Sequence, residues 1–564
     1  MYFFLPTGAF EEKGGWVLDT QFTETVGLPY LLAHGIAKPV SDAYTTVNIE
    51  ETGTYKIYAY TYNWNSPWNA DFAPGIFKVK IDSYEHTFGD VGKEWAWHDG
   101  GYSELKKGEH KISLHDLTGC EGRCAAIFIT NDEETPKNPT EYILKPSAIE
   151  NKYDYIVVGG GITGITAALC AARGGLKTAL VQNRNVVGGN NSSEVRVWLS
   201  GKVCFERFPN LGKVTSELEQ KVAAIMGADN RAENYEDDAK LQKLKDEKNL
   251  TLYLNHALTD AMCKDGKIED VTLLNLDTCR YTKINAPLYA DCTGDGTLGA
   301  LSGADYEMTT SGHMELSNFW SVENTGHKES FPKCPWAINL SNADFPGRIR
   351  ANGMAGEEKE KANARYLGCW RWGAGYEHNP IEKAEYARDT NFRAMYGAWD
   401  AVKNIDGDYA NYKISFSAHV AGKRESRRLL GPLVITKNDL IERKEYSDAI
   451  VGIDWGLDLH TPNRNYYKSF VEGDAFLCSD GLEKFQTPYY LPYRCLYSRN
   501  IDNLFMAGRC ISVTHDALGP VRVMRTCGMM GEVIAHAAIL CQRYSISPDE
   551  LYTDKIEELK SIFI

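Results

Sequence analysis

Several chemically active side chains lie near the C-terminal end of the sequence. Residues 509–525 contain His515 together with Arg509, Arg522 and Arg525. A histidine titrates near neutral pH, so His515 can take up or release a proton under ordinary conditions. We predict that His515 is a general base or acid; the alternative is a histidine that only hydrogen-bonds its own loop. The arginines can bind phosphate, anchor a substrate or pair with acids.

A second histidine, His419, immediately precedes a densely charged segment, 422–431 (GKRESRRLLG). A run of charges usually forms a solvated face, but this position could also place the His419 ring in the same cleft. The predicted catalytic residues are therefore His515, His419 and Arg522. No metal site is predicted, because the closest cysteine pair, Cys120 and Cys124, has no second pair at a suitable spacing.

These groups need a scaffold, and the clearest scaffold signal begins at Tyr153. An apolar strand (153–158, YDYIVV) is followed by Gly159-Gly160-Gly161-Ile162-Thr163-Gly164, an alanine-rich helix and a second strand at 177–181. Gly159 allows a sharp turn, Gly161 lets backbone approach a pyrophosphate, and Gly164 lets the helix pack closely on the sheet. The helix N-terminus favours the negative charge. The unit therefore predicts dinucleotide binding.

One residue departs from the usual pattern of such units. The second strand normally ends in an acid that binds a ribose hydroxyl, whereas this chain has Gln182. An amide oxygen can still accept a hydrogen bond from a hydroxyl, without the strength that a charge adds. The change weakens the prediction of ribose binding at this position, and the fold prediction stands.

Three later segments identify the dinucleotide. Residues 184–189 (RNVVGG), 289–296 (YADCTGDG) and 503–509 (NLFMAGR) occur in the order found in the large flavoprotein group that includes glutathione reductase and fumarate reductase. The sequence resembles that group, and the resemblance implies FAD as cofactor. The predicted cofactor-binding residues are Gly159, Gly161, Gly164, Gln182, Asn183, Arg184, Gly188, Gly189, Asn190, Ser193, Gly294, Asp295, Gly508, Arg509 and Arg525.

A closer resemblance covers nearly the whole chain. Residues 188–197 (GGNNSSEVRV), 422–431 and 508–531 are similar to a family of bacterial FAD-dependent oxidoreductases, as are 14–19 (GGWVLD) and 95–101 (WAWHDGG) near the N-terminus. The resemblance implies FAD and redox chemistry. It also gives the N-terminal stretch the character of a carbohydrate-binding module.

The N-terminal 130 residues show short alternating runs separated by turn residues, a pattern typical of a β-sandwich. Trp64, Trp68, Trp95 and Trp97 lie near asparagines and Asp99, a combination that can grip a sugar, although tryptophans can equally fill a core. The predicted class is α/β: a Rossmann-like FAD-binding fold with an inserted substrate domain, preceded by an all-β sandwich. We assign 1–130 to the sandwich, 131–152 to a linker, 153–310 and 501–564 to the FAD-binding unit, and 311–500 to a substrate or cap region.

Composition limits the partners. The net charge of −15 disfavours nucleic acid and anionic membranes. No apolar run approaches the length of about 20 residues that crosses a bilayer, and the N-terminus lacks the basic start of a secretory signal. Fourteen cysteines without such a signal predict reduced thiols in a cytoplasmic protein. A homo-oligomer would leave no separable signature.

Together these features predict an FAD-dependent oxidoreductase that oxidises a secondary alcohol of a carbohydrate or glycoside to a ketone and passes electrons to an unidentified acceptor. A reductase of an activated C=C bond is the main alternative, with Arg509, Arg522 and Arg525 as an anion clamp. A glycan-binding protein with an inactive flavin fold is the third. A flavin–disulfide relay is not expected, because no CxxxxC pair follows the first FAD unit.

Overall fold

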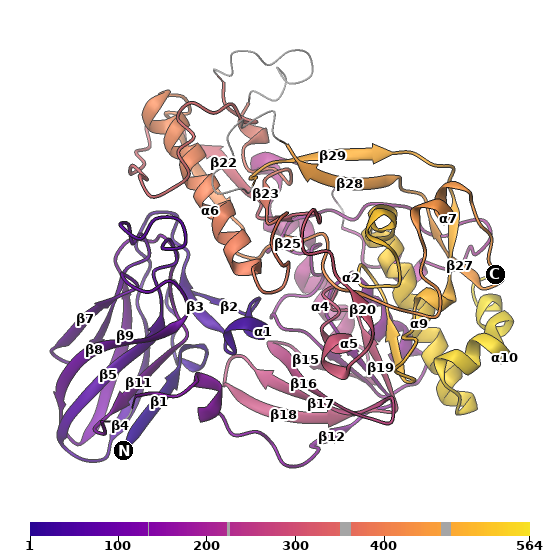
Figure 1. The fold of residues 1–564 in the computed structure, drawn as a ribbon, viewed down its shortest axis with the longest axis horizontal. Helices are drawn as coiled ribbons and strands as arrows, with labels where there is room; N and C mark the ends of the chain where they lie inside the picture. The colour runs from indigo at the N-terminus through magenta and orange to yellow at the C-terminus, as the bar shows by residue number, and fades with distance from the viewer. Residues whose placement is uncertain (134, 221, 223–225, 350–362, 464–474) are drawn as a thin grey trace.

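The computed structural model describes residues 1–564 except 134, 221, 223–225, 350–362 and 464–474 (Figure 1). Two of these gaps, 350–362 and 464–474, belong to the predicted cap region and lie outside the described residues. The fold is mixed α/β, with a Rossmann-like FAD-binding unit and additional domains, as predicted from the sequence.

Residues 1–130 form an N-terminal module of antiparallel sheets. The first sheet contains, in spatial order, β1 (Tyr2–Pro6), β11 (Ala126–Thr130), β5 (Gly53–Thr61) and β8 (Ala96–Leu105). The second contains β4 (Ala43–Ile49), β9 (Gly108–Asp116), β6 (Phe77–Ile81) and β7 (Tyr84–Phe88). A smaller sheet contains β10 (Gly122–Cys124), β3 (Tyr30–Ala33) and β2 (Val17–Asp19), and the short helix α1 (Thr23–Val26) follows β2.

Alternating side chains explain why the two larger sheets pack together. Every second residue of β6 is buried, as expected for a strand with one face on a core. Ile57 and Ile127 of the first sheet share one hydrophobic cluster with Val79 and Ile112 of the second. The module therefore has its own core between its two sheets.

The following segment, 131–152, leads into the second part of the molecule. It contains a 3₁₀ turn at Pro139–Tyr142, and its last two residues form β12 (Asn151–Lys152). β12 joins a four-stranded sheet with β18 (Arg280–Asn285), β17 (Lys267–Asn275) and β16 (His256–Lys264). The end of the predicted linker is thus already part of the body.

A five-stranded parallel sheet carries the FAD-binding unit. Its strands, in spatial order, are β15 (Leu250–Tyr253), β14 (Thr178–Val181), β13 (Tyr155–Val158), β19 (Leu288–Asp291) and β31 (Leu504–Met506). The helix α2 (Ile162–Arg173) connects β13 to β14, and α9 (Met524–Tyr544) and α10 (Pro548–Ser561) follow β31. α2 and α9 touch closely, since a Cβ at Gly531 would lie 2.3 Å from the Thr163 carbonyl oxygen.

The remaining elements lie mostly between β19 and β31 in the sequence. The helices are α3 (Lys213–Ser216), α4 (Asp237–Lys245), α5 (Thr297–Ser302), α6 (Ala384–Asp400), α7 (Lys437–Ile441) and α8 (Leu518–Val521). The strands are β20 (Tyr306–Glu307), β21 (Leu316–Ser317), β22 (Trp320–Asn324), β23 (Gly373–Ala374), β24 (Tyr412–Ser417), β25 (Gly422–Lys423), β26 (Arg428–Leu429), β27 (Ala449–Ile453), β28 (Leu457–Pro462), β29 (Cys478–Glu483) and β30 (Tyr489–Pro492).

Among the described residues, no single helix has the length and apolar character needed to cross a membrane. The segments His515–Val521 and Met524–Tyr544 satisfy the length and composition only as a pair, with a bend of 89° between them.

Charged side chains, most of them fully buried, join the N-terminal module to α6, which lies above it in Figure 1. Arg388 on α6 pairs with Asp19 at the end of β2, and both side chains are fully buried. Arg123 on β10 donates to both carboxylate oxygens of Asp389 at 2.9 and 3.1 Å, and to Glu385 at 2.8 Å. Removing one member of a buried ion pair leaves its partner uncompensated, so the module and α6 depend on each other.

We expect Asp19→Ala to destabilise the protein by about 3 kcal/mol, because Arg388 would lose a fully buried carboxylate and keep only its ion pairs with Asp389 and Glu385. Asp305→Ala is the matched control: it removes the acid of an ion pair with Arg499 in which both side chains are almost half exposed, and should cost less than about 1 kcal/mol. Urea unfolding followed by tryptophan fluorescence measures both. Equal midpoints for the two variants would contradict this account of the interface.

Candidate functional site

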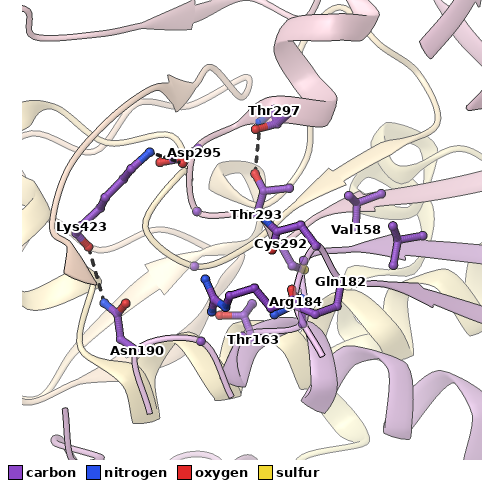
Figure 2. A pocket seen from close by; sticks show the side chains of 18 of the residues that line it. Val158, Thr163, Gln182, Arg184, Asn190, Cys292, Thr293, Asp295, Thr297 and Lys423 are labelled. Atoms are coloured by element: carbon purple, nitrogen blue, oxygen red, sulfur yellow. Dashed lines mark hydrogen bonds and ion pairs between the residues drawn. The ribbon is translucent and has the colours of Figure 1, made fainter. Parts of the chain in front are cut away.

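Most of the predicted cofactor residues line one cavity at the carboxyl ends of the parallel strands (Figure 2). Those that line it are Gly159, Gly161, Gln182, Asn183, Arg184, Gly188, Gly189, Asn190, Gly294, Asp295, Gly508 and Arg509. Parallel sheets bind ligands at this edge because the loops after several strands converge there. Segments separated by more than 300 residues in the sequence thus form one wall.

The glycines of the first turn fit a bound pyrophosphate. Gly159 has φ +105°, and a Cβ there would lie 2.3 Å from the Cys292 carbonyl oxygen. A Cβ at Gly161 would meet only the Gly189 Cα, at 3.9 Å, so this position is open to the cavity. A Cβ at Gly164 would lie 1.7 Å from the Gly159 oxygen, which requires glycine for the packing of α2. No side chain caps the first turn of α2, leaving its N–H groups for an anion.

Gln182 has a structural role at the end of β14. Its Oε1 accepts the Gly160 N–H at 2.9 Å, and its Nε2 donates to the Val186 carbonyl at 3.0 Å. The amide therefore braces the glycine turn against the segment that follows the second strand. The side chain borders the cavity, but the bond to Gly160 occupies one of the two acceptor positions of the oxygen that was expected to bind a ribose hydroxyl.

A compact charged group lies where β19 and β31 end. Asp295 accepts from Lys423 Nζ at 2.8 Å, and it also pairs with Arg509 and with the Ser426 hydroxyl. Burial alone would raise the pKa of Asp295, but the two cations outweigh burial and hold this pKa well below its usual range. The Arg509 guanidinium is therefore committed to Asp295 and Ser426.

His515 is oriented by a buried carboxylate. Its Nδ1 lies 2.8 and 2.9 Å from the two carboxylate oxygens of Glu425, which is 2% exposed. Burial opposes the charge on Glu425, but His515 and Arg428 outweigh it and lower the Glu425 pKa. In the described part of the chain, Nε2 has no hydrogen-bond partner, and one third of the side chain is exposed. This geometry holds the proton on Nδ1 and leaves Nε2 able to accept another.

His515 itself does not border the cavity. It begins the turn His515–Ala517, which leads through α8 to Arg522, and Arg522 does border it. Arg522 donates to the backbone oxygen of Asp458 at 2.9 Å, and its Nε is buried without a partner among the described residues.

The other predicted residues lie elsewhere. His419 is directed toward the N-terminal module, where its ring lies 5.8 Å from that of His34. Burial, together with His34, lowers the His419 pKa to about 3, so the ring is neutral at pH 7. Arg525 pairs with Glu219, and the Ser193 N–H donates to Asp237. Neither Arg525 nor Ser193 borders the cavity.

A buried polar group behind Arg522 was not predicted from the sequence. His460 Nδ1 lies 2.9 Å from Glu315 Oε1 and 3.3 Å from Cys478 Sγ, and its Nε2 lies 3.5 Å from Asp458 Oδ1. Burial opposes ionisation of Asp458, but His460 and Arg522 lower its pKa to about 2. Asp458 and His460 are two residues apart on β28 and so share one face of the strand, a spacing that could have revealed them.

Glu315, His460 and Cys478 could also hold a metal ion, because their donor atoms lie within 4.8 Å of one another. However, Arg424 donates to the same Glu315 oxygen at 2.9 Å, and Arg522 pairs with Asp458. Two guanidinium groups already balance the two carboxylates, and burial raises the pKa of the Cys478 thiol. The two arginines thus already supply positive charge at this group, although Glu315 Oε2 and Arg522 Nε are buried without a hydrogen-bond partner among the described residues.

The tryptophans of the N-terminal module are largely engaged within the protein. Trp64 is 1% exposed and donates to the Cys120 carbonyl. Trp95 donates to Glu385 on α6, and Trp97 donates to the Lys137 carbonyl. Trp68 stacks on Tyr386 with ring centroids 4.5 Å apart. These side chains hold the module together and connect it to α6, in agreement with the core-filling role that the sequence left open beside sugar binding.

The parallel sheet, its glycine turn and the cavity at its carboxyl edge define a dinucleotide-binding protein. Residues 154–561 match the family model described as FAD dependent oxidoreductase, and the chain belongs to that family. It is an FAD-dependent enzyme.

Weak matches among solved structures include two proteins described as reductases or reductase-like and one carbohydrate binding module. A geranylgeranyl bacteriochlorophyll reductase-like protein from Thermoplasma acidophilum is 14% identical over 73% of this chain and 84% of its own, with a TM-score of 0.34. Quinol fumarate reductase FrdA of E. coli is 11% identical over 73% and 74%, with a TM-score of 0.32. A family 35 carbohydrate binding module from Clostridium thermocellum is 14% identical over 23% and 99%, with a TM-score of 0.19. Similarities of this size assign none of these activities to the chain.

We expect Gly161→Val to abolish flavin content, because the added side chain would enter the space kept open for the pyrophosphate. Gly53→Val is the matched control: the residue starts a strand, and a Cβ there would meet only Tyr55, at 3.8 Å. The absorbance of the purified proteins near 450 nm reports the bound flavin. A Gly161→Val protein that keeps full flavin content would contradict the assignment of the turn.

Proposed function

We propose that this protein oxidises a secondary alcohol of a carbohydrate or glycoside to a ketone. In such a reaction the carbon loses a hydride and the hydroxyl loses a proton. FAD, when bound in the cavity, supplies the hydride acceptor. The protein must position the alcohol, accept its proton and prevent side reactions at the cofactor.

The observation that carries this proposal is the pair formed by His515 and Glu425. The buried carboxylate fixes the imidazole through Nδ1 and stabilises the positive charge that the ring acquires on protonation. Nε2 then takes the hydroxyl proton of the substrate. His419 is less suited to this role, because its pKa of about 3 makes it a weak base and its ring is turned toward the N-terminal module.

The arrangement of the arginines favours alcohol oxidation over reduction of an activated C=C bond. That alternative needs several free guanidinium groups around one anionic substrate. Arg509 is committed to Asp295, Arg525 pairs with Glu219, and of the three only Arg522 has a buried nitrogen without a partner in the described part of the chain. The open glycine turn also argues against a flavin fold that has lost its cofactor.

The carbohydrate part of the proposal is supported by the sequence resemblance of residues 1–130 and by their two-sheet architecture. The packed tryptophans do not add to it. The electron acceptor that returns FAD to its oxidised state is an unassigned partner.

We expect His515→Asn to keep FAD bound while its reduction by substrate slows at least about 100-fold, since a positioned base contributes about 10²–10⁴-fold. Stopped-flow bleaching of the flavin band measures the rate, and reduction by dithionite, which needs no base, should be unchanged. His327→Asn is the matched control, because His327 forms an exposed pair with Glu329. Similar substrate rates for His515→Asn and wild type across pH 6–9 would rule out His515 as the base.

The substrate class is tested anaerobically in two assays. Free sugars and glycosides are added to the oxidised enzyme, and bleaching of the flavin is followed. Enoates are added to enzyme whose flavin has first been reduced chemically, and reoxidation of the flavin is followed. Bleaching by sugars or glycosides alone is the expected result. Oxidation of the pre-reduced flavin by an enoate would instead support C=C reduction, and no response to any compound would support the glycan-binding alternative.

A further inference from the structure

We propose that the N-terminal module completes the FAD site: residues 20–24 cover the adenosine half of the cofactor, and Glu24 supplies the ribose-binding carboxylate that the second strand lacks. This inference rests on the FAD-binding cavity and is independent of the substrate. The family match begins at residue 154, so residues 20–24 lie outside it.

The first support is position. The strands β2 and β3 and the helix α1 project from the sandwich toward the FAD-binding unit (Figure 1). Thr20, Gln21, Thr23 and Glu24 line the same cavity as the glycine turn. The module therefore forms part of the cofactor cavity wall.

The second support places Thr20, the first residue of this segment, at the adenosine end. Thr20 also borders a neighbouring cavity with Arg184 and Asn185, which directly follow the second strand. In dinucleotide-binding folds the ribose lies at the end of that strand, and the pyrophosphate lies at the first helix. Met524 and Cys527, from the start of α9, border the cavity beside the pyrophosphate turn and belong to a different part of the wall.

The third support is that the segment is held in place. Gln21 Nε2 donates to the His419 carbonyl at 3.0 Å, and Gln21 Oε1 accepts the Ala421 N–H at 2.7 Å. Asp19, one residue before Thr20, forms the buried pair with Arg388. A wall fixed at both ends loses little freedom when a ligand binds against it.

The fourth support is an unfilled chemical role. Gln182 occupies the position of the usual ribose acid, and its oxygen is bound to Gly160. Glu24 Oε1 pairs with Arg427, whereas Oε2 has no partner among the described residues and the side chain is 36% exposed. An ionised carboxylate accepts hydrogen bonds from ribose hydroxyls more strongly than an amide does.

The test uses the full-length apoprotein and three probes: FAD, ADP, which contains only the adenosine half, and FMN, which contains only the flavin half. Dissociation constants are measured by calorimetry for wild type, Glu24→Ala and Glu24→Gln. We expect both variants to bind FAD and ADP at least about tenfold more weakly and to bind FMN as wild type does. Glu85→Gln, which alters an exposed pair with Lys78 in the same module, should match wild type with all three probes.

Arg427→Met separates a direct role of Glu24 from mere docking of the module. It removes the ion pair but keeps the carboxylate, so ADP should bind more tightly to Arg427→Met than to Glu24→Ala. Equal losses of ADP affinity in these two variants would overturn the proposal, because the carboxylate would then act only through the ion pair. Unchanged ADP affinity in Glu24→Ala, or an equal loss for FMN, would overturn it as well.

Discussion

The molecule depends on charges that only the two halves together can stabilise. Arg388 and Arg123 have no exposure to water, and their carboxylate partners come from both sides of the contact between the N-terminal module and α6. A buried charge without its partner has a much higher free energy than the same charge in water, so each of these groups needs its partner to stay buried. The β-sandwich is therefore a structural part of the enzyme, and the position of β2 relative to the body is fixed by electrostatics as well as by packing.

The buried ion pair of Asp19 lies next in the sequence to residues that line the cavity. Asp19 ends β2, and the next residues form part of the cavity wall. On the body side, Lys423 borders the cavity and binds Asp295, while two residues later Glu425 orients His515. One short segment of the inserted region thus connects the cofactor cavity to the proposed base. The cofactor cavity and the proposed base share a scaffold, although the residues come from four distant parts of the chain.

The sequence predicts the glycine turn of the cofactor site, because this turn is formed by residues that are close together in the sequence. The turn at Gly159–Gly164 needs glycines at fixed spacings, and the strand before it and the helix after it follow within about 30 residues, so pattern alone identifies the unit. Contacts between distant segments leave no such pattern. Nothing near Asp19 indicates Arg388, and nothing near Glu315 indicates His460 or Cys478. Pattern could not place His419, whose partner His34 lies in another module. Trp68 and Trp95 contact α6, which is distant in the sequence, so their packing could not be predicted from the local pattern.

The order of the strands in the parallel sheet has a consequence for biosynthesis. β13, β14, β15 and β19 are complete once residue 291 has left the ribosome, but their neighbour β31 and the helix α9 are made more than 200 residues later. The cavity wall contains residues from both extremes, Thr20 and Cys527. A nascent chain thus has no finished cofactor cavity until Cys527 has been made. The full cavity wall therefore exists only once α9 has packed on α2, so bound flavin would report that these distant segments have come together.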